Sequence, residues 1–524
     1  MTAAVTPADR SRRRASGLRQ SALVTIVGTA VVLAACSSSA QTATHRSPPT
    51  TSGSAPDIVI GHSGRFLTDA AGQVIVLHGF NMVSKVPPYE PAAAGFGGVA
   101  AQALAGDGFD VVRLGVIYSA VEPAPGVFSA AYLDSIANTV AQLGRAGVYS
   151  LLDFHQDQMS VGFGGEGWPA WSVETDGLAV RRFVFPLGYT ASPALNAAFD
   201  NFWADRPGPG GVGLQARYAA AWRYVAARFS SDPWVLGYDL MNEPWPAKAT
   251  DAQLGAFYKR VIAAIRSVDR QHLIFYEPNV LFDLGAPTTL PALGDDALGM
   301  SFHDYCPTDA ASHPAECARD EARPIDNALT HAAATGDALV LSEFGATDDL
   351  AVLRRVTELA DASGVSWIEW AYCGCDDPTG TIPSSVEGLV VNPGLPAAGS
   401  NVDASKLAVL SEPSARLTSG TPVSYAFDEA TRTLRYTYSV IAPDGHRFGA
   451  GSCTAIVVPP AQYPGGYDVA VAGARVTSPR NAGVLTLEQL GTDSSGLSDV
   501  TVEIRPASGG HTTPPLEASI AACV

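Results

Sequence analysis

Apolar residues follow two alternating patterns between about residue 74 and residue 372. Short β-branched and aliphatic runs are typical of strands buried on both faces of a parallel sheet. These runs lie at Val74–Met82, Asp110–Ile117, Tyr149–His155, Val235–Met241, Leu273–Glu277, Leu298–Tyr305, Ala338–Phe344 and Val365–Tyr372. Segments with helical spacing lie between most of them, at Gly97–Ala105, Ala130–Gly144, Leu214–Phe229, Ala252–Val268, Ile325–Ala334 and Leu350–Ala362. Eight strands alternating with helices predict an α/β fold, a (β/α)8 TIM barrel.

A doubly wound open sheet is the alternative, but no glycine-rich phosphate loop follows the first strand. After about Pro413 the pattern changes to short alternating strands typical of an antiparallel β-sandwich. These strands lie within Ser424–Ser439 (two strands around a turn) and at Thr454–Val458, Tyr467–Val471, Gly483–Glu488 and Val500–Ile504. We therefore expect a (β/α)8 barrel over residues 57–412 and a small C-terminal β-sandwich over residues 413–524.

The N-terminus has the pattern of an export signal. Five arginines precede a short apolar stretch, Ala22–Ala35, which predicts a signal peptide over residues 1–35. The stretch ends in Leu-Ala-Ala-Cys, which resembles a bacterial lipobox, with Cys36 as the lipidated first residue of the mature chain. An ordinary cleavage site after Ala35 is the alternative. Residues 36–56, rich in Ser, Thr and Pro, predict a disordered tether. The protein is thus expected to be exported, as a cell-surface lipoprotein or a secreted protein.

Charge and cysteine content narrow the possible partners. The net charge of −18 becomes −22 without residues 1–35, because five of 33 basic and one of 51 acidic residues are removed. This charge argues against nucleic acid or an anionic membrane as an electrostatic partner. Six cysteines after Cys36 predict disulfides in an oxidising compartment. The economical pairs are Cys306 with Cys317 and Cys453 with Cys523, and Cys373 can pair with Cys375, although six cysteines allow about fifteen connectivities. No paired CxxC motifs indicate a metal, and we expect no metal and no cofactor.

Two glutamates lie at the ends of predicted strands. Glu243 follows the run Val235–Met241 and precedes Pro244, which disfavours a helix at Glu243. Glu343 ends the run Ala338–Phe344. The C-terminal ends of barrel strands face the active site, and two carboxylates there are the minimum requirement for glycoside hydrolysis. Alone, each glutamate could equally be a helix cap or a salt-bridge partner.

Other polar and aromatic residues share this placement. Arg113 can hold a nucleophilic carboxylate by a charge-assisted hydrogen bond, and Asn242 is placed to hold a sugar 2-hydroxyl. We list the remaining candidates for sugar binding together: Asp153, His155, Asp157, His303, Tyr305 and Trp370. Taken singly, the histidines could be core residues and Trp367 or Trp370 could be packing residues. Their common position at strand ends favours a site.

This set of residues resembles the signature of glycoside hydrolase family 5, a retaining (β/α)8 family. The segments GFNMVSK (Gly79–Lys85), LDFHQD, DLMNEPW, FHDYC and SEFGAT are similar to its endoglycoceramidase branch. The resemblance implies hydrolysis of the β-glycosidic bond between glycan and ceramide, with Glu243 as acid/base, Glu343 as nucleophile and Lys85 as a sugar contact. It also implies a glycolipid substrate at a membrane or micelle surface, and we expect a monomer. Glu277 is interpreted as a structural or substrate-positioning carboxylate.

Two alternatives remain open. The first is an exo-acting β-glucosidase on glucosylceramide or a steryl glucoside, and the second is a non-catalytic glycolipid-binding lipoprotein. Both glutamates are present, which disfavours the second. The unusually long connection Asp157–Gly211 is rich in aromatic residues, including Trp168 and Trp171. It either holds the lipid beside the sugar site or is an accessory patch that protects the barrel.

Overall fold

The computed structural model describes residues 60–306, 313–375, 377–380, 382–491, 499–508 and residue 523. The described residues belong to one compact unit. The expected signal peptide, Cys36 lipidation and tether lie outside them. Within the described ranges, no helix has the length and apolar character needed to cross a membrane.

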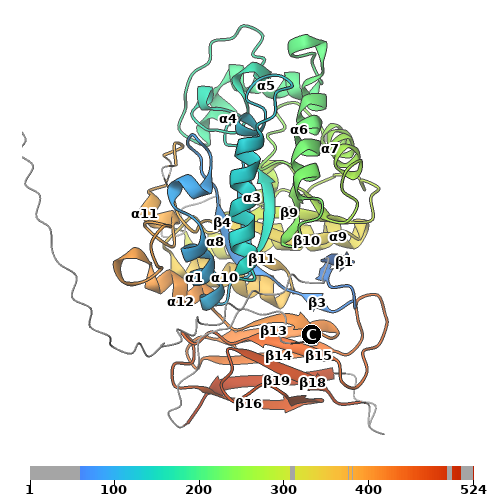
Figure 1. Ribbon diagram of the computed structural model, residues 1–524, viewed down its shortest axis with the longest axis vertical. Coiled ribbons are helices and arrows are strands. Elements are labelled where there is room, and N and C mark those ends of the chain that lie inside the picture. Colours follow the sequence, from blue (N-terminus) through green and yellow to red (C-terminus); the bar gives the residue numbers. More distant parts are fainter. Residues whose placement is uncertain are drawn as a thin grey trace, which may run out of the picture. The chain divides into compact units, whose positions relative to one another are not determined.

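Eight parallel strands close into a barrel, which confirms the predicted fold class (Figure 1). In barrel order they are β4 (His78–Met82), β5 (Val111–Val116), β6 (Tyr149–Phe154), β7 (Val235–Asp239), β8 (Leu273–Tyr276), β9 (Leu298–Asp304), β10 (Ala338–Phe344) and β11 (Ser366–Glu369). Every residue of these strands is buried, because side chains on one face fill the barrel and those on the other pack under the helices.

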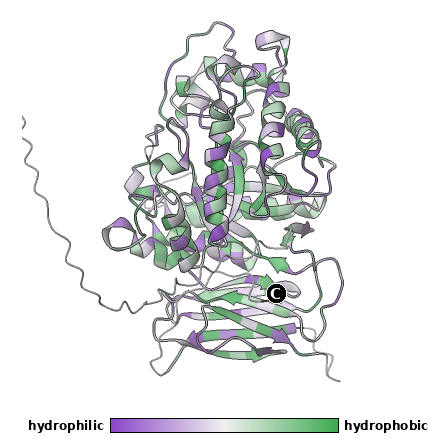
Figure 2. Ribbon diagram, viewed as in Figure 1, coloured by the Kyte–Doolittle hydropathy of each residue, from purple (hydrophilic) through white to green (hydrophobic). Residues whose placement is uncertain are grey.

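The helices around the barrel form where apolar residues recur with helical spacing. Helix α3 (Ala130–Arg145) buries Leu133, Ile136, Val140 and Leu143, and the Ser129 side chain caps its N-terminus by accepting from Tyr132 N. Figure 2 shows hydrophobic and hydrophilic residues along the same helix. The other helices are α1 (Gly98–Asp107), α2 (Tyr118–Val121), α6 (Leu214–Phe229), α7 (Asp251–Arg266), α8 (Pro314–Asp320), α9 (Ala322–Thr335), α10 (Leu350–Ala362), α11 (Ser384–Glu387) and α12 (Ala404–Leu410).

The first predicted strand is divided in the structure. Val74–Ile75 forms β3, whereas β4 begins at His78 and enters the barrel. Strand β3 pairs antiparallel with β12 (Ser414–Thr418), the first strand of the C-terminal region. An ion pair between Arg416 and Asp110 and a 2.8 Å hydrogen bond from Arg416 Nη2 to Gly108 O join β12 to the entry of β5. The C-terminal sheet is therefore continuous with the chain that leads into the barrel.

Two antiparallel sheets combine the C-terminal strands with β1–β3, which come from residues 61–75. One has the order β1-β2-β3-β12-β15-β18-β17 and the other β13-β14-β19-β16. Their remaining strands are β1 (Gly61–Ser63), β2 (Phe66–Thr68), β13 (Thr421–Asp428), β14 (Thr433–Ser439), β15 (Cys453–Val457), β16 (Tyr467–Ala472), β17 (Ala474–Val476), β18 (Val484–Gln489) and β19 (Asp499–Pro506). The two economical disulfides, Cys306–Cys317 and Cys453–Cys523, are present, and Cys373 is bonded to Cys375.

The long connection after β6 contains α4 (Leu187–Ala191) and α5 (Pro193–Trp203). Trp168 is only 4% exposed, and its ring lies 4.3 Å from that of Phe202. Trp171 is half-buried, and its Nε1 donates to Glu122 O at 3.1 Å. The expectation that Trp168 lies on a lipid-binding surface is therefore wrong, because its ring packs inside the protein. Its loss would leave a cavity rather than an exposed gap.

Candidate active site

Arg113 lies at the centre of the site, inside the barrel. It ends no strand but sits within β5, where the side chain is fully buried. Its guanidinium contacts six side chains, and we list them with their shortest distances: Glu343 (2.5 Å), Asp239 (2.8 Å), Glu277 (2.8 Å), Asn242 (3.0 Å), Asp153 (3.1 Å) and Asn81 (3.2 Å). Burial opposes its charge, but the four carboxylates together raise the pKa of Arg113 well above its ordinary value. A permanently charged fork thus holds these side chains in place.

Glu343 is held from two sides at the end of β10. Arg113 Nη1 donates to its Oε1 at 2.5 Å, and the Tyr305 hydroxyl donates to its Oε2 at 3.0 Å. Burial and the neighbouring Glu343 carboxylate raise the pKa of Tyr305 well above its ordinary value, so the hydroxyl remains a donor. Two donors on the two oxygens fix the orientation of the carboxylate.

Glu243 adopts a strained backbone conformation at the position just beyond β7. Its φ is 44°, a left-handed value that costs roughly 1–3 kcal/mol for a residue other than glycine. The backbone is held at both ends: Glu243 N donates to Glu277 Oε2 at 2.7 Å, and Gln156 Nε2 donates to Glu243 O at 3.1 Å. Burial raises the pKa of Glu277 to about 8. Glu277 therefore joins the Glu243 backbone to Arg113, in agreement with its interpretation as a positioning carboxylate.

His303 lies between the two glutamates. Its Nδ1 is 3.2 Å from Glu243 Oε1 and 3.6 Å from Glu343 Oε2, so these oxygens are at most 6.8 Å apart, the sum of the two distances. Retaining glycosidases hold their carboxyl groups about 5–5.5 Å apart, and inverting enzymes about 6.5–9.5 Å apart. Burial opposes protonation of the ring, but the surrounding carboxylates raise the pKa of His303 well above its ordinary value. The upper bound of 6.8 Å between these two oxygens is compatible with the carboxyl separation of a retaining enzyme.

Asp153 and His155 follow each other at the end of β6. His155 Nδ1 lies 2.7 Å from Asp153 Oδ2, and Asp153 Oδ1 lies 3.1 Å from Arg113 Nη2. Burial lowers the pKa of His155 to about 3, so the ring is neutral, with its proton on Nδ1 and a lone pair on Nε2. Asp153 has no exposed surface. The structure therefore corrects the prediction that Asp153 binds sugar: it orients His155 instead.

Two of the remaining sugar-binding candidates, His155 and Lys85, meet around Trp370. The rings of Trp370 and His155 are stacked with centroids 5.2 Å apart, and Lys85 Nζ lies 4.4 Å from the Trp370 centroid. Asn242 Oδ1 accepts from Arg113, and its Nδ2 donates to Gln156 O at 3.1 Å, which leaves one amide hydrogen. Trp367 stacks on His78 in the core, so of the two tryptophans only Trp370 adjoins the site.

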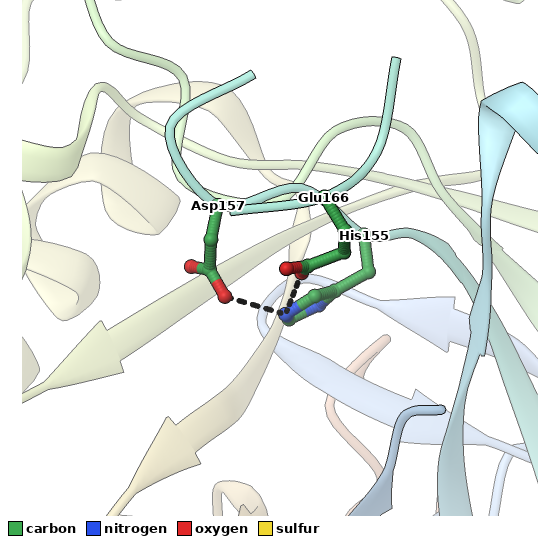
Figure 3. A group of neighbouring side chains, drawn as sticks. All are labelled: His155, Asp157 and Glu166. Atoms are coloured by element: carbon green, nitrogen blue, oxygen red, sulfur yellow. Dashed lines mark ion pairs between the residues drawn. The ribbon is translucent and has the colours of Figure 1, made fainter. Parts of the chain in front are cut away.

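His155, Asp157 and Glu166 point toward one another, as Figure 3 shows. The His155 Nε2 atom is 3.9 Å from Asp157 Oδ2 and 4.0 Å from Glu166 Oε1. Such a group could ligate a cation. Lys85 Nζ, however, donates to the same Asp157 oxygen at 2.6 Å and to Asp377 at 2.8 Å. The Lys85 ammonium thus already supplies a positive charge to this cluster, and the absence of a metal stays a prediction.

Several residues of the site were missed in the sequence. They are Asn81, Asp239, Gln156, Glu166, Asp283, Asp377 and Glu387. Asn81 and Asp239 lie within apolar strands, where a buried polar residue is itself a signal. Glycines on both sides of Glu166 mark a tight turn and were the available signal there. The others lie in loops or in short helical turns without a periodic apolar pattern, and the sequence gave no signal for them.

Comparison with known proteins places the chain in a family. The family described as "Cellulase (glycosyl hydrolase family 5)" matches residues 69–376, and the "Glycoside hydrolase family 5 C-terminal domain" matches residues 413–504. Endoglycoceramidase I of Rhodococcus hoagii is 30% identical over 496 residues, which are 88% of this chain and 92% of that protein.

Solved structures of endo-glycoceramidase II from Rhodococcus sp. share the fold. Its lactosyl-enzyme intermediate matches with a TM-score of 0.69 at 28% identity, over 85% of this chain and 100% of that one. Its ganglioside GM3 complex matches with a TM-score of 0.67 at 26% identity, over 85% and 100%. The family match spans more than half of the chain and agrees with the buried pair of glutamates at the strand ends. This chain therefore belongs to glycosyl hydrolase family 5, on its endoglycoceramidase branch.

Proposed function

We propose that this protein is a retaining endo-acting β-glycosidase that cleaves the bond between glycan and ceramide in glycosphingolipids. One observation supports the chemistry most strongly: Glu243 and Glu343 both lie against His303. Glu243 Oε1 and Glu343 Oε2 are therefore at most 6.8 Å apart, the sum of their distances to His303 Nδ1. The substrate class is supported by relatives named endoglycoceramidase and by the lactosyl-enzyme and ganglioside GM3 structures of one of them.

In the first step, a Glu343 oxygen attacks the anomeric carbon of the sugar next to ceramide. Arg113 and Tyr305 hold this carboxylate in place for the attack. Glu243 gives its proton to the glycosidic oxygen, so ceramide leaves with a neutral hydroxyl. The bond to ceramide breaks, and a covalent glycosyl ester on Glu343 forms.

In the second step, water enters from the side that ceramide has left. Glu243, now a carboxylate, takes a proton from this water as it attacks the anomeric carbon. The ester bond breaks, Glu343 is regenerated, and the glycan leaves with the anomeric configuration of the substrate. No cofactor is required for either step.

On the sugar side we assign four contact residues: Lys85, His155, Asn242 and Trp370. The neutral His155 offers a lone pair at Nε2, and Lys85 offers ammonium hydrogens, so together they can accept from and donate to sugar hydroxyls. Asn242 offers its remaining amide hydrogen. Of these residues, His155 is linked to Glu343 through Asp153 and Arg113.

On the lipid side we assign an aliphatic patch of the connection after β6. Its exposed members are Val161, Leu178, Val180, Val184 and Leu187, and Arg181 and Arg182 lie among them. Contiguous exposed apolar side chains are typical of interaction sites. We propose that this patch contacts the surface of a membrane or micelle that holds the glycolipid. We further propose an exported monomer anchored through Cys36, which would keep the patch near such a surface.

The products of a purified glycosphingolipid test this function. Incubation with ganglioside GM3 or lactosylceramide should release the intact oligosaccharide and ceramide, identified by mass spectrometry. Glu343→Gln should abolish both products. Stepwise release of single sugars would indicate an exo-acting enzyme, and hydrolysis of cello-oligosaccharides alone would contradict the lipid substrate.

A further inference from the structure

Glu387 holds the end of the last barrel strand through both its side chain and its backbone. It is the last residue of α11, in the connection between β11 and α12, and is 3% exposed. Its Oε2 accepts from Trp370 Nε1 at 3.2 Å, and its carbonyl accepts from Ala371 N at 3.0 Å. The carboxylate thus fixes the rotation of the indole, while the backbone fixes the strand end that bears it.

Trp370 in turn contacts two of the residues assigned to sugar binding. His155 stacks on the indole at 5.2 Å with an interplanar angle of 17°, and Lys85 Nζ lies 4.4 Å from its centroid. Asp377, from the same connection as Glu387, accepts from Lys85 Nζ at 2.8 Å. One loop therefore supplies a carboxylate to the indole and another to the ammonium that lies over it.

The chemistry of Glu387 is unusual for a residue that only packs. Burying a carboxyl group costs free energy unless it is well hydrogen-bonded. Its Oε1 atom has no hydrogen-bond partner among the described residues, and its Oε2 atom contacts the indole. Burial raises the pKa of Glu387 to about 7, as expected for a carboxyl group with few donors. An apolar residue would fill this space at lower cost, so the contact with Trp370 is the feature that distinguishes glutamate here.

We propose that Glu387 is a positioning residue for the glycosidase reaction: it fixes the Trp370 indole and, through it, places His155 and Lys85 against the sugar. The inference rests on the proposed function of this site. Positioning of binding groups to within a fraction of an ångström affects the rate even when the positioning residue never touches the substrate.

A double-mutant cycle tests this relationship in the full chain with a soluble aryl β-lactoside. Glu387→Met keeps the volume but lacks the acceptor, Glu387→Gln keeps an acceptor oxygen, and Trp370→Phe lacks the indole N–H. We expect kcat/KM to fall about tenfold in Glu387→Met and to stay within about threefold in Glu387→Gln. In the Trp370→Phe background, Glu387→Met should change kcat/KM by less than about twofold, because the donor is absent.

Leaving-group dependence separates this role from a defect in acid catalysis. The loss in Glu387→Met should be the same for a dinitrophenyl and a methylumbelliferyl lactoside, since the sugar side is affected. A loss in proton donation by Glu243 would instead shrink with the better leaving group. Ser385→Ala, an exposed neighbour on α11, is the matched control and should leave kcat/KM unchanged.

If Glu387→Met lowers kcat/KM by the same factor in the wild-type and the Trp370→Phe backgrounds, the proposal is overturned. It is also overturned if Glu387→Gln and Glu387→Met lower kcat/KM equally. If Glu387→Met does not fold, Trp370→Phe decides: it must lower kcat/KM by a similar factor, and unchanged activity would overturn the proposal. Failure of the wild-type protein to cleave glycolipid while it cleaves aryl lactosides would reject the proposed substrate but leave this cycle valid.

Discussion

Arg113 Nη1 lies 2.5 Å from Glu343 Oε1, which ties the proposed nucleophile to a guanidinium that itself has no exposed surface. The same guanidinium contacts Glu277, whose other oxygen holds the Glu243 backbone. Both glutamates of the proposed mechanism therefore depend on one cation. The geometry of the Arg113 guanidinium is needed in addition to its charge, because only arginine offers a planar fork of donors.

Arg113→Lys should therefore lose most of the activity although it keeps the charge. Lysine cannot satisfy several buried carboxylates at once, and breaking such a buried network typically costs about 3–5 kcal/mol. We expect a fall in kcat/KM of at least about a hundredfold and a lower Tm, measured by steady-state kinetics and thermal melting. Wild-type stability in this variant would show that the network is dispensable for the fold.

Tyr305→Phe should separate catalysis from stability. It removes the hydrogen bond to Glu343 Oε2 and keeps the ring, so kcat should fall by about tenfold to a hundredfold with little change in Tm. Tyr238→Phe is the matched control, because the Tyr238 hydroxyl donates to Asp269 outside the site. We expect this control to lower Tm without reducing kcat. Equal kinetic effects in the two variants would remove Tyr305 from the catalytic machinery.

The aliphatic patch predicts a difference between lipid and soluble substrates. Val184 and Leu187 are 60% and 55% exposed. Replacing both by serine should lower the turnover of micellar glycolipid about five- to tenfold, since each CH₂ removed from contact forfeits about 0.8 kcal/mol. Activity on a soluble aryl lactoside should not change. Val423→Ser with Leu490→Ser, exposed in the C-terminal region, is the control, and the same loss there would contradict a role for the patch.

Glu412 lies outside the candidate site, and we expect its titration to make the stability of the protein depend on pH. Burial and nearby acidic groups raise its pKa from 4.5 to about 9 in the folded protein. The folded state then binds more protons than the unfolded state between these values, so the stability contribution of Glu412 is lost as pH rises through this window. Glu412→Gln does not titrate, so its gain in Tm over wild type should grow from pH 5 to pH 9, by about 2–4 °C per kcal/mol. A gain that is independent of pH would contradict the assignment.

The eight barrel strands could be predicted because each is a short apolar run in the sequence. The runs that lead to the candidate site residues also end in polar residues. The prediction joined Val74 to Met82, since nothing local shows that Val74–Ile75 pairs with a strand more than 300 residues later. Long-range pairing of this kind has no signature in periodicity.

The proximity of Glu243 and Glu343 could be predicted from the sequence, because strand direction alone brings strand ends to one face of a barrel. The hydrogen-bond and packing partners of individual side chains could not be predicted in this way. Asp153 and Trp168 have residue types suited to substrate contact, yet the fold buries the first behind His155 and the second against Phe202. Glu387 and Asp377 reach the site from a loop whose path depends on the packing of α11.

Covalent labelling tests the central claim most directly. A 2-deoxy-2-fluoro-β-lactoside with an activated leaving group slows the second step, so the ester intermediate accumulates and can be located by peptide mass spectrometry. We predict a single lactosyl label on Glu343, formed with time-dependent loss of activity. A label on Glu277 or Glu243, or a product released with inverted anomeric configuration, would contradict the account.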